Sequence, residues 1–430
     1  MAPRTTVNSF WQGLFESQPK IVETINRSGF YDLDASMIKE RHIEPRIACK
    51  LDFRGHVPKS LSDQNLSVLA IRNGVYRIAK TDPFLDINPS LFTDEDPIEM
   101  SEFSVPAHIQ VLAGGGYSSE SKALDAAHIS GMLDWVFGER VELVLRGREY
   151  SREFHFSLPR LPERLQTVEY EIGNVQIEVD GGYEGRNGLY LVEVKSVVEN
   201  NMNLRQLLYP QLHYQNYVVK GKPVHTFILF YESCTGLYHF VPFVLENAET
   251  QGIFKFDFSQ YRRARIAPSV DEQIDYWEEI KSLPAVPGFA DTKVPFPQAD
   301  EFAKIFDSFR LLGDSEPITL YDLFTKYDLT PRQHDYYWNV LRWLRLAERR
   351  SEGLVLTDYG RNLNRLADKA LLFELAEKIF SESVPNSLLG GRDPGSRDWK
   401  PYSLAQNTQE RRIQSIRSWI RFFERNLSQR

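Results

Sequence analysis

The chain has 430 residues, of which 42% are hydrophobic and 13% aromatic, enough for two or three domains with sizeable cores. It contains no run of about eighteen uninterrupted apolar residues, which argues against a membrane-spanning helix and against a membrane partner. Its two cysteines, Cys49 and Cys234, lack the spacing of a disulfide framework or a metal site. We therefore expect ordinary buried thiols and a reducing cytoplasm.

The net charge is acidic. The chain contains 51 Lys and Arg and 59 Asp and Glu, which gives a formal charge of −8. This balance argues against a protein that binds polyanions over its whole surface, although local basic surfaces remain compatible with a DNA enzyme. Residues 391–430 differ from the rest, with nine Lys or Arg against four Asp or Glu, a net charge of +5.

Residues 1–112 are predicted to form an N-terminal α+β region. Apolar residues at helical spacing precede Gly29, a short helix follows near Asp34, and the segment 66–80 reads as a hairpin. Its turn is Asn73-Gly74, which we expect to supply two positive-φ positions. Basic residues gather here, and each one taken alone is more readily a solvated surface residue than a DNA contact. They are Arg46, Lys50, Arg54, Lys59, Arg72, Arg77 and Lys80.

Residues 113–281 are predicted to form a mixed α/β core, entered through Gly114–Gly116. Ser118 or Ser119 can cap a helix that continues to about Phe137. Glu120 in its first turn is either a metal ligand or an acid favoured by the helix dipole. A second helix is expected over 203–217, and strands over 139–146, 152–157, 167–173, 175–180, 189–197, 226–231 and 237–243.

The stretch from Gln176 to Lys195 carries the chemistry of this core. Side chains alternate along a strand, so Gln176, Glu178 and Asp180 share one face, and Glu193 shares a face with Lys195. The glycine-rich segment 181–188 predicts a turn that folds the second strand back on the first. Asp180 and Glu193 should then converge, and because the surrounding LYLVEVKSVV is apolar, buried charges there indicate a function.

Two carboxylates and an ammonium group at one point suit phosphodiester hydrolysis. Carboxylate oxygens can hold Mg²⁺ while leaving room for waters and a phosphate oxygen. The metal lowers the pKa of a bound water and neutralises charge that develops on the phosphate. Lys195 can orient the attacking water or stabilise the transition state. The alternative is that Glu193-Val194-Lys195 is a chance acid-x-Lys pattern on a solvated strand.

At these residues the chain resembles the PD-(D/E)XK nuclease superfamily, with twelve residues between Asp180 and Glu193-Val194-Lys195. More narrowly, it resembles type II restriction endonucleases that carry QIE(I/V)D, a Gly-Tyr-Glu turn, an E-x-K strand and an RQLLYP-like helix. Val179 stands where the superfamily often has proline. The resemblance implies a restriction-endonuclease-like mixed sheet flanked by helices, with Mg²⁺ as the cofactor. It implies Asp180, Glu193 and Lys195 as catalytic residues, Asp180, Glu193, Val194 and Glu120 at the metal, and Gln176, Glu178 and Gln206 in support.

The same resemblance extends to the segment EPR-x-x-x-K-x-D near the N-terminus. It implies DNA contacts by Arg46, Lys50 and Arg72.

Residues 282–300 contain four prolines and no sustained period, so they are predicted to be a domain linker. Residues 301–430 then give three helices and a hairpin turning at Glu352-Gly353, the order of a winged helix. Thr330, Pro331 and Gln333 form a capping box at the start of the third helix. The amphipathic last helix, about 409–427, is expected to pack on this domain.

Within the winged helix, Arg332, Gln333 and Tyr336 are candidate DNA-reading residues, and Arg349 and Arg350 candidate phosphate contacts. The alternative is that the domain serves in protein interaction or dimerisation. Acidic residues along the third helix and hairpin favour that alternative, because they weaken the positive field.

Together these features predict a type II restriction endonuclease of a prokaryotic cytoplasm, which cuts both strands of double-stranded DNA at a short sequence. Palindromic sites favour a homodimer over a monomer that cuts the strands in succession. A cognate DNA methyltransferase would act on the same site without forming a stable complex. Two alternatives are a structure-specific repair, recombination or transposition nuclease and a winged-helix regulator with an inactive core. Retention of Asp180, Glu193 and Lys195 argues against the regulator.

Overall fold

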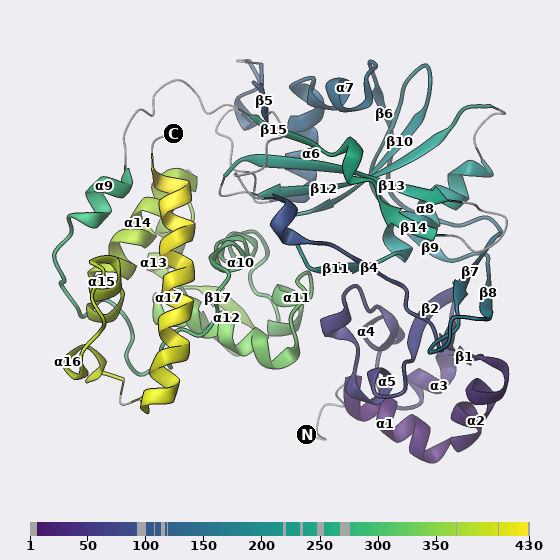
Figure 1. Ribbon diagram of the computed structural model, residues 1–430, viewed down its shortest axis with the longest axis horizontal. Coiled ribbons are helices and arrows are strands. Elements are labelled where there is room, and N and C mark those ends of the chain that lie inside the picture. The colour runs from purple at the N-terminus through teal and green to yellow at the C-terminus, as the bar shows by residue number, and fades with distance from the viewer. Residues whose placement is uncertain are drawn as a thin grey trace. The chain divides into compact units, whose positions relative to one another are not determined.

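The computed structural model describes residues 7–92, 100–106, 108–112, 117, 119–217, 221–232, 235–246, 253–266, 276–366, 368–402 and 404–428. Gly114–Gly116, Ser118 and Cys234 lie outside these ranges. The chain combines helices with a large mixed sheet and is an α+β protein, as the sequence predicts (Figure 1). No helix among the described residues has the length and apolarity needed to span a membrane.

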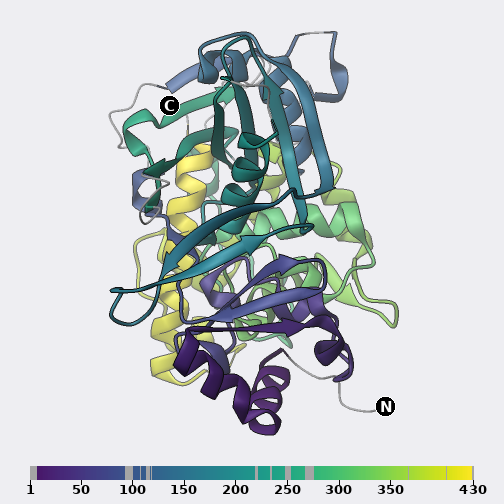
Figure 2. The ribbon, with the colours of Figure 1, turned by 90° about the vertical axis from the view of Figure 1, so that its right-hand side faces the viewer.

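The N-terminal region places five helices around a three-stranded antiparallel sheet in the order β1-β3-β2. The purple helices α1 and α2 lie together beside this sheet (Figure 1, Figure 2). Gly29, in the left-handed region with φ 91°, ends α2 as predicted. The elements are α1 (Val7–Ser17), α2 (Pro19–Ser28), β1 (Phe30–Asp34), α3 (Ala35–Lys39), α4 (Pro45–Cys49), α5 (Lys59–Ser62), β2 (Ser67–Arg72) and β3 (Val75–Ala79).

The predicted hairpin of β2 and β3 is present, but its turn differs from expectation. Gly74 has φ 77°, whereas Asn73 is not among the described residues with positive φ. The register also shifts between Ala70 and Arg72, which marks an irregularity in β2 just before the turn. The turn therefore uses one left-handed position and not two.

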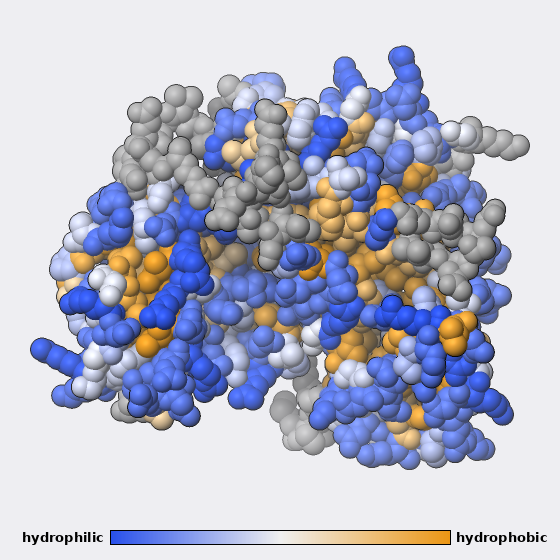
Figure 3. Space-filling view, in the orientation of Figure 1, coloured by the Kyte–Doolittle hydropathy of each residue, from blue (hydrophilic) through white to orange (hydrophobic). Residues whose placement is uncertain are grey.

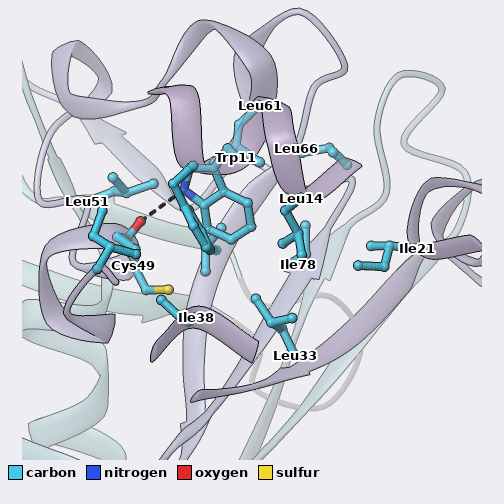
Figure 4. Close-up of a cluster of buried hydrophobic side chains, with 14 of the residues drawn as sticks. Trp11, Leu14, Ile21, Leu33, Ile38, Cys49, Leu51, Leu61, Leu66 and Ile78 are labelled. Atoms are coloured by element: carbon cyan, nitrogen blue, oxygen red, sulfur yellow. Dashed lines mark hydrogen bonds between the residues drawn. The ribbon is translucent and has the colours of Figure 1, made fainter. Parts of the chain in front are cut away.

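A buried cluster holds this region together (Figure 4). Trp11 is fully buried, and its indole Nε1 donates a hydrogen bond of 3.1 Å to the carbonyl of Ala48, which ties α1 to α4. Cys49 lies in the same cluster as an unpaired thiol, and burial raises its pKa. It is thus the ordinary buried cysteine that the sequence predicts.

The main sheet has eight strands in the order β5-β15-β13-β12-β10-β9-β6, with β14 paired to β13. β6 pairs antiparallel with β9, and β9 with β10. The sheet neighbours β10 and β12 are connected through the helix α8. The strands are β5 (Met100–Phe103), β6 (Glu142–Tyr150), β9 (Gln176–Glu184), β10 (Leu189–Lys195), β12 (Val224–Glu232), β13 (Leu237–Glu246), β14 (Ile253–Phe256) and β15 (Arg262–Ile266).

Several helices and strands of this region differ from those predicted. The helix expected to reach Phe137 is broken at Gly131, which has φ 78°. The strands expected at 152–157 and 167–173 form a separate two-stranded sheet, because each is the other's antiparallel partner. β5, β14 and β15 were not predicted. The remaining elements are β4 (Phe84–Asp86), α6 (Glu120–Ile129), α7 (Met132–Phe137), β7 (Phe154–Pro159), β8 (Thr167–Ile172), β11 (Asn201–Asn203) and α8 (Arg205–Gln215).

The turn between β9 and β10 is shorter than the glycine content predicts, because Gly181 and Gly182 belong to β9. A Cβ on Gly182 would lie 2.7 Å from Cβ of Leu145 on β6, so glycine permits close strand packing here. A Cβ on Gly185 would lie 2.4 Å from the carboxyl carbon of Glu139. These glycines serve close approach within the sheet and at the turn.

The C-terminal part is mainly helical. The helices α10, α11 and α12 precede the antiparallel hairpin of β16 and β17, which matches the predicted order of elements. The elements are α9 (Tyr276–Lys281), α10 (Phe302–Ser315), α11 (Leu320–Phe324), α12 (Pro331–Trp343), β16 (Ala347–Arg349), β17 (Leu354–Leu356), α13 (Asp358–Leu363), α14 (Asp368–Ser381), α15 (Ser383–Leu389), α16 (Ser396–Trp399) and α17 (Gln406–Leu427).

Segment 282–300 has no helix or strand, as its prolines predict, yet it packs closely. Phe296 is buried against Trp343 and Trp399. α17 contacts the same segment, because Trp419 Nε1 donates to the carbonyl of Ala299 at 3.0 Å, and Trp419 and Phe423 are also in ring contact with Phe302 of α10. Segment 282–300 is therefore an extended part of the C-terminal packing and not a loose connection.

By compactness the chain divides into two units, whose boundary passes within β12, β13 and β15. The first comprises Met1–Glu99, Leu133–Leu229 and His239–Arg263, and the second Met100–Met132, Phe230–Tyr238 and Ala264–Arg430. Hydrophilic side chains cover most of the face shown in Figure 3, with hydrophobic residues in smaller areas between them.

Candidate active site

The predicted catalytic residues lie on the antiparallel strands β9 and β10. The register pairs Leu191 with Gly182 and Val192 with Gly181, and Glu193 and Asp180 are the next residues of the two strands. The negative charge of Glu193 raises the pKa of Asp180, so the two carboxylates lie close together. β10 is buried along its length up to Val194, as its apolar sequence predicts.

Three contacts organise the site. Lys195 Nζ donates to Glu193 Oε1 at 2.5 Å, and both side chains are largely buried. Gln206 Nε2, from α8, donates to the same Glu193 oxygen at 2.8 Å. The backbone N–H of Val194 donates to Asp180 Oδ2 at 2.8 Å. Asp180, Glu193, Lys195 and Gln206 are thus brought together as the sequence analysis expects.

The electrostatics of Asp180 are unusual for an aspartate. Burial, followed by the nearby negative charge of Glu193, raises the pKa of Asp180 to about 7. The Lys195 ammonium group and the Val194 N–H oppose this rise, and Glu178 adds to it. Two carboxylates that disfavour one another's ionisation are a typical feature of a site built for an added positive charge.

The donor set fits Mg²⁺. The carboxylates of Asp180 and Glu193 provide hard oxygen ligands, and Lys195 and Gln206 hold Glu193 in place through hydrogen bonds. A divalent cation would relieve the repulsion between the two carboxylates that contributes to the raised pKa of Asp180. Asp180 and Glu193 would hold the ion, and the backbone carbonyl of Val194 is the further ligand that the sequence suggests. The described residues contain no cluster of three or more His, Cys, Asp or Glu with metal-site geometry, so carboxylates alone would not complete the coordination shell.

The supporting residues predicted on β9 occupy different positions. Glu178 is exposed and forms a salt bridge of 3.0 Å with Arg148 on β6. Gln176 is exposed at the start of β9, opposite Tyr150 of β6. Arg146, also on β6, donates from Nε to the backbone carbonyl of Asp180 at 3.2 Å. Glu178 therefore acts near the site through charge, whereas Gln176 lies further along the strand.

Glu120 is the first residue of α6, whose N-cap is Ser119, and Ser119 Oγ accepts from Lys122 N at 3.1 Å. It belongs to the second compact unit, while Asp180, Glu193 and Lys195 belong to the first. Its place in the first turn is the one that the helix dipole favours for an acid.

Some of the N-terminal basic residues are exposed to solvent, and others form salt bridges with acidic residues. Arg46 in α4 and Arg72 at the end of β2 are exposed. Arg77 is neutralised by Asp32, and Arg54 pairs with Asp82 and Asp86, so these two arginines contribute little net positive charge. Lys50 forms a salt bridge of 3.4 Å with Asp52.

In the C-terminal part, Arg332 is exposed at the start of α12, and its guanidinium lies 5.9 Å from the ring centroid of Tyr336. Gln333 completes the predicted capping box, because its Oε1 accepts from Thr330 N at 2.8 Å. Arg349 and Arg350 are exposed, and Arg350 pairs with Glu348 at 2.6 Å.

A groove of about 630 Å³ runs beside α12 and β16. Its lining combines three arginines with three acids and four uncharged residues, so its positive and negative side chains are equal in number. The lining residues are Asp291, Asp335, Trp338, Asn339, Arg342, Arg345, Ala347, Glu348, Arg349 and Thr357.

Sequence reasoning missed several of these residues. Arg146 and Arg148 alternate along a strand that was predicted only as far as residue 146, so their pairing with β9 was not foreseen. Arg205 directly precedes Gln206 in the RQLLYP segment, and that adjacency was an available signal. Arg342 lies on α12 with the predicted Arg332, and helical spacing places it on the face of Asp335 and Asn339. Arg345 follows the end of α12 and has φ 56°.

Three family models match separate segments of the chain, each described as a domain of unknown function. DUF6996 matches residues 8–78, DUF6997 matches residues 87–261 and DUF7226 matches residues 304–391. Asp180, Glu193, Lys195 and Gln206 all fall within the second segment. No curated protein and no solved structure matches the chain.

Proposed function

We propose that the protein is a Mg²⁺-dependent endodeoxyribonuclease, and more narrowly a type II restriction endonuclease on a restriction-endonuclease-like core. The observation that carries the proposal is the cluster of Asp180, Glu193 and Lys195 on adjacent buried strands, joined by Gln206 from α8. Burying three charges at one end of a strand pair is costly unless they have a task. Two carboxylates and a lysine ammonium group are suited to metal-assisted phosphodiester hydrolysis.

Each residue of the site has a separate role in the proposed reaction. Gln206 holds Glu193 in one orientation through the 2.8 Å hydrogen bond, and Val194 N–H does the same for Asp180. Lys195 carries a cation at the same point, where it can orient an attacking water and stabilise charge on a phosphate oxygen. Bound Mg²⁺ supplies charge neutralisation and a water of lowered pKa.

For residues 301–430 we propose a winged helix. The order α10, α11, α12, hairpin supports this proposal, as does an isolated antiparallel bridge that pairs Ile318 with Leu354 of β17. The capped N-terminal end of α12 would then approach a DNA major groove. A protein-interaction or dimerisation role remains the second candidate, because acidic Asp335 and Glu348 line the groove beside α12.

The proposed partners follow from the proposed reaction. Double-stranded DNA is the substrate, and a homodimer would match the twofold symmetry of a palindromic site. A methyltransferase acting on the same sequence would protect the host DNA, without a stable complex with this chain. A prokaryotic cytoplasm is the compartment in which such a pair operates.

Digestion of unmethylated phage DNA tests the proposal. The purified protein with Mg²⁺ or Mn²⁺ should yield discrete fragments whose sequenced ends share one short motif. EDTA should stop the reaction, and Ca²⁺ should support binding with little cleavage, because its longer and looser coordination does not align the attack. Asp180→Ala, Glu193→Ala and Lys195→Ala proteins, purified in parallel, exclude a contaminating nuclease.

Other outcomes decide between the alternatives. A smear, or cleavage confined to junctions and flaps, would favour a structure-specific nuclease. Activity that persists in the three variants or without metal would overturn the assignment of the site. DNA binding without cleavage under any divalent cation would favour the regulator.

A further inference from the structure

The segment Lys50–Arg54 of the N-terminal region is fixed against the chain that follows the catalytic strand. Asn203 N donates to the carbonyl of Asp52 at 2.8 Å, and Asn203 Nδ2 donates to the carbonyl of Leu51 at 2.9 Å. Arg54 N donates to Asn201 Oδ1 at 2.8 Å. Asn201 and Asn203 form β11, which begins six residues after Lys195. These bonds hold the segment through backbone and amide groups, without using any charge.

Charges gather around one residue of this segment. The Asp52 side chain is only 15% exposed, and its Oδ1 accepts from Arg205 Nη2 at 2.7 Å, while Lys50 Nζ lies 3.4 Å from Oδ2. Burial raises the pKa of Asp52, yet Arg205, Lys50, Lys195 and His56 together hold it below its ordinary value. The catalytic lysine is thus one of the positive charges that Asp52 senses.

The balance of charge at this point is positive. Asp52 is one carboxylate between two cations, Lys50 and Arg205, and within the described ranges neither cation forms a salt bridge with a second acid. Arg54 nearby is paired with both Asp82 and Asp86. Lys50 is 38% exposed and Arg205 22% exposed, so both retain donors that can reach solvent. A guanidinium and an ammonium group held side by side by one carboxylate suit a phosphate oxygen pair.

We propose that Lys50 and Arg205, positioned by Asp52, form a phosphate-binding pair for the DNA strand that enters the Asp180, Glu193 and Lys195 site. The inference rests on the proposed nuclease function and adds to it. It assigns the N-terminal region a part of the active site, since Lys50 and Asp52 come from that region and Arg205 from the start of α8. The pair contacts the backbone and fixes the position of the strand, without reading sequence.

A structural ion pair would look similar in the folded protein but would behave differently toward DNA. If Asp52 and Arg205 only secured the segment, their loss would lower stability and leave the salt dependence of DNA binding unchanged. A phosphate contact releases counterions, so its loss flattens the dependence of log Kd on log salt by about one unit.

The experiment measures DNA binding by fluorescence anisotropy in Ca²⁺ over a salt series, together with single-turnover cleavage in Mg²⁺. Arg205→Gln and Lys50→Gln should each bind more weakly and flatten the salt dependence by about one unit. Arg140→Gln is the matched control, because Arg140 is 84% exposed, pairs with Glu142 and lies toward the turn end of β9. Its salt dependence should equal that of the wild type.

Two further variants separate position from charge. Arg205→Lys keeps the charge, so its salt dependence should stay at the wild-type value. If Arg205→Gln fails to fold, Lys50→Gln carries the test, and a wild-type salt dependence in Lys50→Gln overturns the phosphate pair. Asp52→Asn keeps both cations but removes their anchor, so the salt dependence should persist while single-turnover cleavage slows. Thermal melting of each variant reports folding.

The outcomes distinguish this inference from the proposed function. Wild-type protein that neither binds nor cleaves DNA overturns the nuclease proposal. Wild-type protein that cleaves, with Arg205→Gln and Lys50→Gln showing the wild-type salt dependence, overturns the phosphate pair alone. Slower cleavage in Asp52→Asn that merely tracks a loss of folded protein also overturns it.

Discussion

Val194 donates its backbone N–H to Oδ2 of Asp180 at 2.8 Å, which makes the backbone between Glu193 and Lys195 part of the candidate site. This bond favours the ionised form of Asp180. It is outweighed by burial and by the charge of Glu193, which raise the pKa of Asp180 from 3.8 to about 7. In the metal-free protein the fold therefore raises the pKa of this aspartate into the neutral range.

This raised pKa predicts how the metal-free protein responds to pH. The unfolded chain ionises Asp180 near 3.8 and the folded chain near 7, so unfolding releases a proton between these values and stability falls as pH rises through that window. Asp180→Asn has no carboxyl group to ionise, so it should not show this fall in stability with rising pH. At about pH 8 without metal the variant should therefore melt above the wild type, with the gap closing toward about pH 4.

Differential scanning calorimetry after metal removal checks this prediction. Added Mg²⁺ should raise the melting temperature of the wild type and leave that of Asp180→Asn almost unchanged. Parallel pH profiles in the two proteins would contradict the pKa assigned to Asp180.

Gln206 and Gln176 form a matched pair of predicted supporting residues. Gln206 donates to Glu193 at 2.8 Å, whereas Gln176 is exposed at the start of β9. Loss of a group that orients a metal ligand typically costs about 10–100-fold in metal affinity or activity. Gln206→Ala should therefore lower single-turnover cleavage and raise the Mg²⁺ concentration needed for half-maximal rate. Gln176→Ala should cleave like the wild type, and equal effects in both variants would refute the assignment.

The turn that joins β9 to β10 depends on a carboxylate outside the hairpin. Glu139 accepts from Arg186 N at 2.8 Å, from Asn187 N at 3.0 Å and from the Tyr190 hydroxyl at 2.7 Å. Although desolvation opposes it, these hydrogen bonds hold the pKa of Glu139 below its ordinary value. The stability they add is present above the ordinary pKa and is lost as pH falls through the lowered one.

Glu139→Gln should consequently lower the melting temperature at neutral pH, and the difference should shrink in acid as the wild-type carboxylate takes up its proton. Glu142→Gln, three residues along the chain, is the control, because Glu142 is exposed and forms a salt bridge of 3.2 Å with the exposed Arg140. Melting curves over an acidic pH series make the comparison. A pH-independent difference would show that shape, and not charge, sets the contribution of Glu139.

The proximity of Asp180, Glu193 and Gln206 could be predicted from the sequence because it depends on local rules. The pairing of two neighbouring strands brings Asp180 near Glu193, and the helix after the second strand brings Gln206 within reach of Glu193. These expectations require only that two neighbouring strands pair. Side-chain period and turn residues carry that information within about twenty residues.

The rest depends on pairings between distant segments, which one sequence does not reveal. Arg146 reaches Asp180 because β6 pairs with β9 through two register shifts. Asp52 reaches Arg205 across more than a hundred residues. Gly182 resembled a turn residue, whereas it lies in a strand because Leu145 packs against it. Tertiary packing decided each of these.

The last prediction concerns the C-terminal module, where substitutions of Gln333, of Arg332 and of the groove arginines should have different effects on stability and DNA binding. Gln333 Oε1 accepts from Thr330, so Gln333→Ala should lower the stability of α12 by about 0.5–2 kcal/mol with little change in sequence preference. If α12 reads bases, Arg332→Ala should cost the preferred site about 1–3 kcal/mol relative to random DNA. Arg342→Ala and Arg349→Ala remove cations that line the groove of about 630 Å³.

These two variants should weaken binding to all sequences alike and flatten the salt dependence by about one unit each, because phosphate contacts release counterions without reading bases. Competition binding in Ca²⁺ with specific and random duplexes, at several salt concentrations, distinguishes the classes, and thermal melting isolates the capping effect. Wild-type DNA binding in Arg332→Ala, Arg342→Ala and Arg349→Ala alike would mean that the module contacts protein and not DNA. Recognition would then fall to the N-terminal region, where Arg46 and Arg72 are the exposed cations to change next.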